Sequence, residues 1–149
     1  MRAIRIISYV VLLGALLFVP LNRIEIADLE PIQAVWMHTE NGNIVLEADT
    51  EDKGAGNTVE TALEDMRNKS TGVVYLDTAQ YLFVSESALG EIPAIQPYFK
   101  GSIRLCKWNG EGGLKEVAKY ADSRNLGQKI KKWNEAGNLP EIPPVKKGK

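Results

Sequence analysis

Two almost uninterrupted apolar runs constrain the fold of this chain more than any other feature. They occupy residues 73–76 and 81–84, with a four-residue polar break between them. Continuous apolar runs are typical of interior strands in a sheet that is covered on both faces. The sequence therefore predicts two buried strands, joined most simply by a turn at residues 77–80, although a sharp bend there would place the second strand elsewhere in the sheet.

An amphipathic helix is predicted before these runs, over residues 58–68. Asn57 and Glu60 stand at the spacing of a capping box, which indicates where the helix begins. One face of the helix carries its apolar residues at the i, i+3, i+4, i+7 spacing: Val59, Ala62, Leu63 and Met66. We expect this face to pack on the sheet.

The remaining chain predicts a mixture of strands and helices. A hairpin is expected from residues 33–37 and 44–48 around the turn at residues 40–43, and residues 103–108 alternate as a half-buried strand. Helices are expected at residues 114–121 and 126–135. The predicted fold class is α+β (mixed α/β): a single small domain over residues 33–140, with a mixed β-sheet packed by helices, followed by a disordered basic tail at residues 141–149.

The N-terminus predicts a membrane anchor over residues 1–22. Arg2 and Arg5 precede sixteen uncharged residues, 6–21. Small residues at a cleavage site are missing, which favours a retained anchor over a cleaved signal peptide. A helix of this length spans about 24 Å, which requires some thinning of the bilayer. The arginines place the N-terminus in the cytoplasm and the domain outside it. Residues 23–32 suit either a stalk or a first edge strand.

Composition excludes several classes of function. The chain of 149 residues has a net charge of −1, so no broad basic surface is expected to gather nucleic acid. Cys106 is the one cysteine and His38 the one histidine, which excludes an intrachain disulfide and leaves little for a metal site. We therefore predict no metal, no cofactor and no nucleic-acid partner, and interpret Cys106 as a small core residue.

Residues 49–60 contain the most suggestive motif. Their carboxylates do not match a calcium loop, because Lys53 stands at the fifth position and the twelfth lies in the predicted helix. A phosphate loop at the two glycines would need a lysine and would face repulsion from the nearby carboxylates. A ligand or partner loop at the start of the helix remains a hypothesis, with four candidate residues: Gly54, Gly56, Asn57 and Thr58.

A small hydrolase is the enzymatic alternative. Ser85 or Ser87 would serve as the nucleophile and His38 as the base. The sequence around the serines lacks the flanking glycines of a nucleophile elbow, so no catalytic residue is assigned. We therefore predict a protein that is not an enzyme.

Several of these segments together carry a family resemblance. Residues 25–29, the hairpin, the helix start at residues 56–63, and residues 74–77 and 82–88 resemble in order the N-terminal domain of the Ger(x)C family, the C subunits of spore germinant receptors. The family pattern matches seven positions here: Gly56, Thr58, Val59, Ala62, Leu63, Glu86 and Ala88. The chain departs from the family in its lack of a lipobox cysteine and of further C-terminal domains.

The resemblance implies fold and membrane placement, and it transfers no ligand-contacting residue. The expected function is that of a non-enzymatic, membrane-anchored accessory or interaction protein of the cell or spore envelope, linked to spore germination. Its globular domain would be extracytoplasmic and its partners would be proteins of a membrane complex. A small-ligand-binding module is the alternative, with the ligand unspecified.

Overall fold

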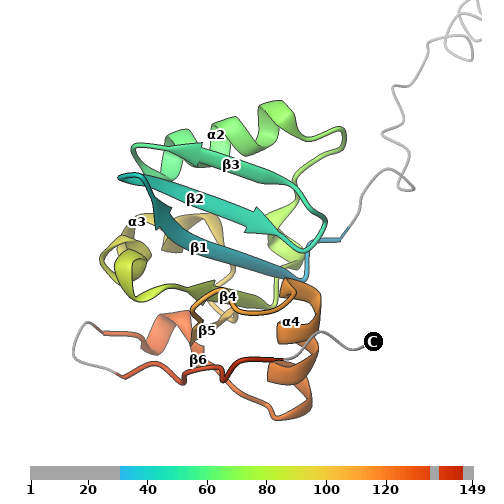
Figure 1. Cartoon of the computed structure of the whole chain (residues 1–149), viewed down its shortest axis with the longest axis vertical. Coiled ribbons are helices and arrows are strands. Elements are labelled where there is room, and N and C mark those ends of the chain that lie inside the picture. The colour runs from blue at the N-terminus through green and yellow to red at the C-terminus, as the bar shows by residue number, and fades with distance from the viewer. Residues whose placement is uncertain (1–30, 135–137, 146–149) are drawn as a thin grey trace, which may run out of the picture.

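The computed structural model describes residues 31–134 and 138–145. Its centre is a mixed sheet of six strands in the order β3-β2-β1-β4-β5-β6 (Figure 1). β1, β4 and β5 run parallel to one another, and the other pairs are antiparallel. The strands are β1 (Ala34–Glu40), β2 (Asn43–Ala48), β3 (Lys53–Gly56), β4 (Tyr81–Val84), β5 (Arg104–Lys107) and β6 (Gln128–Lys129). The predicted α+β class with a mixed sheet is confirmed.

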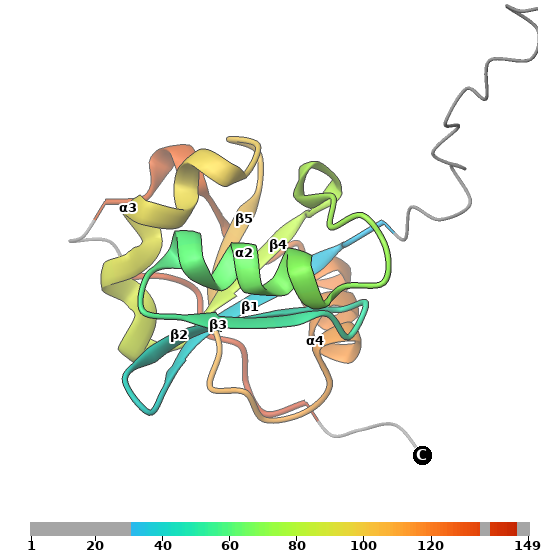
Figure 2. The same cartoon turned by 90° about the horizontal axis from the view of Figure 1, so that it is seen from above.

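Helices cover both faces of the sheet. α2 (Val59–Lys69) and α3 (Ile92–Ile95) contribute to the core on one face, and α4 (Leu114–Ser123) packs on the other (Figure 2). Short 3-10 turns connect these elements: η2 (Leu76–Thr78), η3 (Glu86–Glu91), η4 (Gln96–Tyr98) and η5 (Ile130–Lys132). The predicted hairpin, the first helix and the helix after residue 113 are confirmed, with ends that differ from the prediction by at most three residues.

The position of β4 in the middle of the sheet, between β1 and β5, explains why its residues are all apolar. Leu82 and Val84 point into the α2–α3 core, whereas Tyr81 and Phe83 point into the α4 core. All four side chains are at most 2% exposed. Burial of each such side chain stabilises the fold by about 1.5–3 kcal/mol.

Residues 73–76 do not form the predicted strand. Val73 and Tyr75 are 49% and 45% exposed, and only Leu76, at the start of η2, is buried. The hydrogen-bonding edges of β4 are already taken by β1 and β5. The first apolar run therefore has no place beside the second, and it forms an exposed loop.

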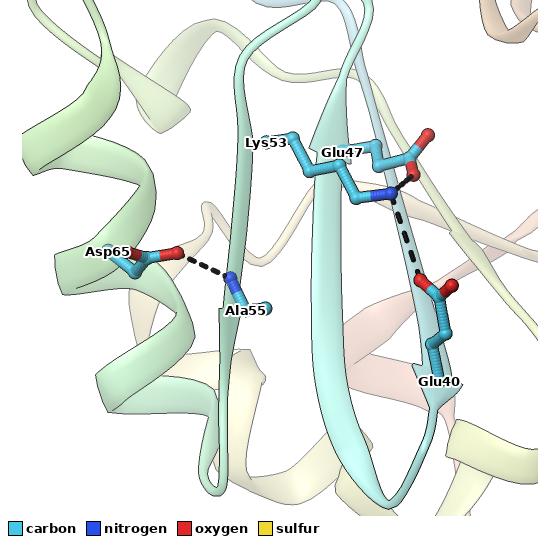
Figure 3. Close-up of polar contacts among 5 residues, drawn as sticks. All are labelled: Glu40, Glu47, Lys53, Ala55 and Asp65. Atoms are coloured by element: carbon cyan, nitrogen blue, oxygen red, sulfur yellow. Dashed lines mark hydrogen bonds and ion pairs between the residues drawn. The ribbon is translucent and has the colours of Figure 1, made fainter.

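β3 replaces the predicted loop at residues 54–56, and its glycines allow α2 to approach closely. A β-carbon at Gly54 would lie 2.6 Å from the Met66 Cβ and would collide with the Ala62 carbonyl oxygen. The Asp65 carboxylate of α2 accepts a hydrogen bond of 2.9 Å from the Ala55 N–H (Figure 3). α2 thereby satisfies a donor on the outer strand of the sheet, a common protection for exposed edges.

The cap of α2 also differs from the prediction. Thr58, not Asn57, is the N-cap residue, and its hydroxyl accepts the Thr61 N–H at 3.2 Å. The Thr61 hydroxyl in turn accepts the Thr58 N–H at 3.0 Å. The capping box is therefore shifted by one residue and uses threonine where Glu60 was expected.

Residues 126–134 do not form the predicted second helix, and residue 135 lies outside the described residues. Gly127 has a φ of +102°, a left-handed conformation that interrupts a helix. The next two residues pair with β5 as β6, and Ile130 begins η5. Leu126, Ile130 and Trp133 still pack on the two cores. Their helical spacing therefore predicted their contact with the core correctly, but it predicted a helix where the chain forms β6 and η5.

The predicted anchor, and residues 23–30 of the predicted stalk or edge strand, lie outside the described residues. Within the described ranges, no helix has the length and apolar character needed to cross a bilayer. Of the expected tail, residues 146–149 also lie outside. The part from Glu141 to Val145 is packed instead: Ile142 is 2% exposed and its N–H donates to the Lys107 carbonyl at 2.9 Å.

Candidate functional site

A groove of about 700 Å³ lies at the carboxyl edge of the parallel strands. Sheets built on parallel strands commonly bind ligands at this edge. The volume falls within the range of small-molecule sites, roughly 300–1,000 Å³. Its lining comes from segments far apart in the sequence: Glu86, Leu89, Gly90, Lys107, Trp133, Asn138, Leu139 and Glu141.

The strands place an ion pair in this groove. Lys107 is the last residue of β5, and Glu86 follows β4 at the start of η3. The Lys107 Nζ lies 2.8 Å from a Glu86 carboxylate oxygen. This hydrogen bond lowers the pKa of Glu86 and raises the pKa of Lys107. Both groups are therefore held in their charged forms.

The C-terminal segment fixes one side of the groove. The Lys107 N–H donates to the Pro140 carbonyl at 2.8 Å, and Glu141 forms an isolated parallel bridge with Lys107. Leu89, Trp133 and Leu139 are partly buried against the core and supply apolar walls. The groove thus offers an apolar floor beside one cation and two carboxylates, a combination suited to binding an amphipathic group.

The four residues of the hypothetical ligand loop lie elsewhere. Gly54 and Gly56 belong to β3, where Gly54 is buried beneath α2. The backbone N–H and the hydroxyl of Thr58 both form hydrogen bonds with Thr61. Asn57 is exposed just before the helix. The geometry gives these residues roles in packing and capping, and a binding role for them stays a prediction.

The sheet brings the hydrolase residues near one another without assembling them. Met37 pairs with Val84, so His38 and Ser85 are the next residues on neighbouring parallel strands. The Ser85 hydroxyl lies 2.8 Å from that of Ser87. His38 stacks instead on Trp36, with ring centroids 3.8 Å apart. No hydrogen bond among the described residues joins His38 to either serine.

His38 belongs to a partly covered polar surface on the α4 side of the sheet. The Lys53 Nζ lies 2.7 Å from Glu47 and 3.9 Å from Glu40 (Figure 3). Burial lowers the pKa of His38, an effect that Glu47 partly opposes. The His38 Nδ1 and the Trp36 Nε1 are buried without a hydrogen-bond partner. Glu47 and Lys53 also line an open depression of about 440 Å³ between the sheet and the start of α4.

Two further residues are explained by burial. Cys106 is fully buried, which raises the pKa of its thiol to about 12 and leaves it unreactive. Asp49 is 9% exposed and its carboxylate accepts the Gln33 N–H at 3.1 Å. In the described part of the chain, no group of three or more His, Cys, Asp or Glu residues is placed to hold a metal ion.

Comparison with known proteins found no matching family model, no matching curated protein and no matching solved structure. The groove could not be predicted from the sequence, because its residues come from four separated segments. The one local signal is Lys107, a lysine that ends an otherwise apolar strand face beside Ile103 and Leu105.

Proposed function

We propose that this protein is a membrane-tethered, non-enzymatic accessory protein of the cell or spore envelope, and that the groove at the carboxyl edge is its partner-binding surface. The observation that carries the proposal is that Pro31 and the groove lie at opposite ends of the parallel strands. The described chain begins at Pro31, beside the amino ends of β1, β4 and β5, and the groove lies at their carboxyl ends.

This opposition suits a tethered binding module. The sixteen uncharged residues 6–21 would hold the chain in the bilayer, and the domain would follow on the outer side. β1 rises about 3.3 Å per residue over its seven residues, so the groove stands roughly 20 Å further from the tether than the start of β1. A partner in the same envelope would meet the groove without obstruction by the tether.

Fractionation of the full chain tests the tether. We expect it to remain with membranes after a carbonate wash, and we expect protease added outside spheroplasts to digest the domain. A variant with Leu12→Arg and Leu16→Arg, which breaks the apolar run, should be lost from the membrane fraction. Recovery of the unaltered full chain in the cytosol would contradict the proposal.

The link to spore germination rests on the resemblance to the Ger(x)C N-terminal domain and is part of this proposal. Deletion of the gene should slow germination in response to at least one germinant, and the full-length gene should restore the rate. Unchanged germination and unchanged sporulation would remove this link and leave the tethered module.

A small-ligand-binding module is the second candidate. The apolar walls and the charges of Lys107, Glu86 and Glu141 favour a small amphipathic zwitterion, whose carboxylate would meet Lys107 and whose amine would meet the two glutamates. A thermal-shift screen of such compounds should give a reproducible increase in the unfolding midpoint. The increase should disappear in Lys107→Ala, whereas Lys119→Ala, an exposed lysine on α4 outside the groove, should retain it.

A further inference from the structure

Two exposed apolar side chains stand out on the described surface. Val73 and Tyr75 are 49% and 45% exposed, and they are the exposed large hydrophobic residues among those described. Both lie on the loop of residues 70–75, between α2 and η2. The sequence of residues 73–76 predicts a buried strand. In the structure, Val73 and Tyr75 are exposed and Val74 is only partly buried against the core.

This loop is joined to the point where the described chain begins. The Thr78 hydroxyl lies 3.0 Å from the Ile32 carbonyl oxygen and 3.1 Å from the Tyr75 carbonyl oxygen. Figures 1 and 2 both show the loop after α2 beside the first residues of β1. Ile32 is itself 1% exposed, so this junction is anchored in the core.

The length of chain before Pro31 limits how far this end can stand from the apolar run. Nine residues, 22–30, separate Leu21 from Pro31. Fully extended, they span at most about 3.6 Å each, or roughly 32 Å, and any less extended conformation brings the loop closer. Because Thr78 joins the loop to Ile32, the loop is the exposed apolar feature at the end of the domain that the tether would enter.

The chemistry of the two side chains suits the membrane interface. Tyrosine is enriched where the headgroups meet the hydrocarbon, because its ring is apolar and its hydroxyl remains hydrated. The two depressions at the same edge are lined by four cations, Lys100, Arg104, Lys115 and Lys119, and by three carboxylates, Asp49, Asp77 and Asp122. These charges favour contact with an anionic lipid surface only slightly. Binding to lipid would therefore depend mainly on Val73 and Tyr75.

We propose that residues 70–75 form a membrane-contact loop, whose Val73 and Tyr75 side chains insert into the interface of the bilayer that holds the chain. The inference rests on the proposed tether. The contact would fix the orientation of the domain, with the carboxyl-edge groove directed away from the lipid. A second copy of the chain, or residues 23–30 folded over the loop, would be the competing occupants.

Spin labels on the full chain test this directly. Val73→Cys, Tyr75→Cys and, as the matched control, the exposed Ala94→Cys of α3 would each be labelled separately. Buried Cys106 needs no replacement. The labelled chains would be reconstituted in vesicles of phosphatidylethanolamine and phosphatidylglycerol. Collision with oxygen, which is concentrated in lipid, is then compared with collision with a water-soluble nickel chelate present on both sides.

We expect labels at residues 73 and 75 to show a several-fold higher ratio of oxygen to nickel collisions than the label at residue 94. Equal ratios at all three sites, in a chain that floats with vesicles after a carbonate wash, would overturn the contact loop and leave the tether intact. Failure to float would overturn the tether and the loop together. Protection of residues 73 and 75 from both reagents, or spin–spin broadening between copies, would show that protein covers the loop and would also overturn it.

Discussion

Histidine 38 is the residue whose protonation the fold opposes most clearly. Burial beside Trp36 lowers the pKa of His38 from its ordinary value of 6.5. The unfolded chain therefore binds a proton at a higher pH than the folded chain does. The resulting contribution to stability is complete above pH 6.5 and is lost as the pH falls through the folded pKa.

Proton NMR of the single histidine checks this shift. We expect the His38 ring protons to titrate below pH 6.5. We also expect the free energy of unfolding to decrease as the pH is lowered from 7 to 5. His38→Phe keeps an aromatic ring against Trp36 and should remove this part of the pH dependence. A titration midpoint at or above 6.5 would contradict the burial argument.

Cysteine 106 gives a second prediction at this scale. Because burial raises the pKa of its thiol to about 12 from 9.0, the thiolate fraction near pH 8 should be lower by about a thousandfold. Reaction with a disulfide reagent should be correspondingly slow in the folded protein and should become fast in guanidinium. Rapid modification without unfolding would show that the thiol is accessible.

At the scale of elements, the contact between α2 and β3 is the most specific packing in the fold. Gly54→Ala would place a methyl group against the Ala62 carbonyl oxygen and Met66, so we expect a loss of about 1–3 kcal/mol in the free energy of unfolding. Gly90→Ala is the matched control, since a β-carbon there meets no atom within 4 Å. Urea unfolding measures both. Equal changes in the two variants would contradict the close approach of α2.

The elements that the sequence predicted correctly are those whose pattern is local. The turn at residues 40–43 and the apolar face of α2 each lie within a dozen residues. Two of the wrong predictions needed information from distant chain segments. Residues 73–76 lack a strand because β1 and β5 occupy both edges of β4. After the left-handed turn at Gly127, Gln128 and Lys129 pair with β5 instead of continuing a helix.

The site was less predictable than the fold, and for the same reason. The groove joins η3, the end of β5 and the C-terminal segment, so no stretch of sequence contains it. In the sequence, Gly54 and Gly56 are compatible with a ligand-binding loop or with close packing, because glycine permits both. The structure explains them by packing, through the collision that a β-carbon at Gly54 would have with α2.

For the whole molecule, the parallel strands give the domain two unlike ends. Their amino ends lie beside Pro31 and the exposed loop of residues 70–75, and their carboxyl ends form the groove. The account therefore predicts a domain that contacts lipid at one end and a partner at the other. The orientation follows from strand direction and from the position of residue 31, rather than from any single contact.

Photo-crosslinking from the groove, in the native host, tests whether the carboxyl edge of the sheet binds a partner. Gly90 lines the groove and a β-carbon there meets no atom within 4 Å, so benzoylphenylalanine would be introduced at this position, with exposed Glu60 on α2 as the matched control position. The account predicts one adduct of defined mass from residue 90 in the membrane fraction. That adduct should be absent from residue 60 and lost in Lys107→Glu, at a temperature well below the unfolding midpoint of that variant. An absence of adducts from residue 90, or the same adducts from both positions regardless of Lys107, would contradict the groove as the partner-binding surface.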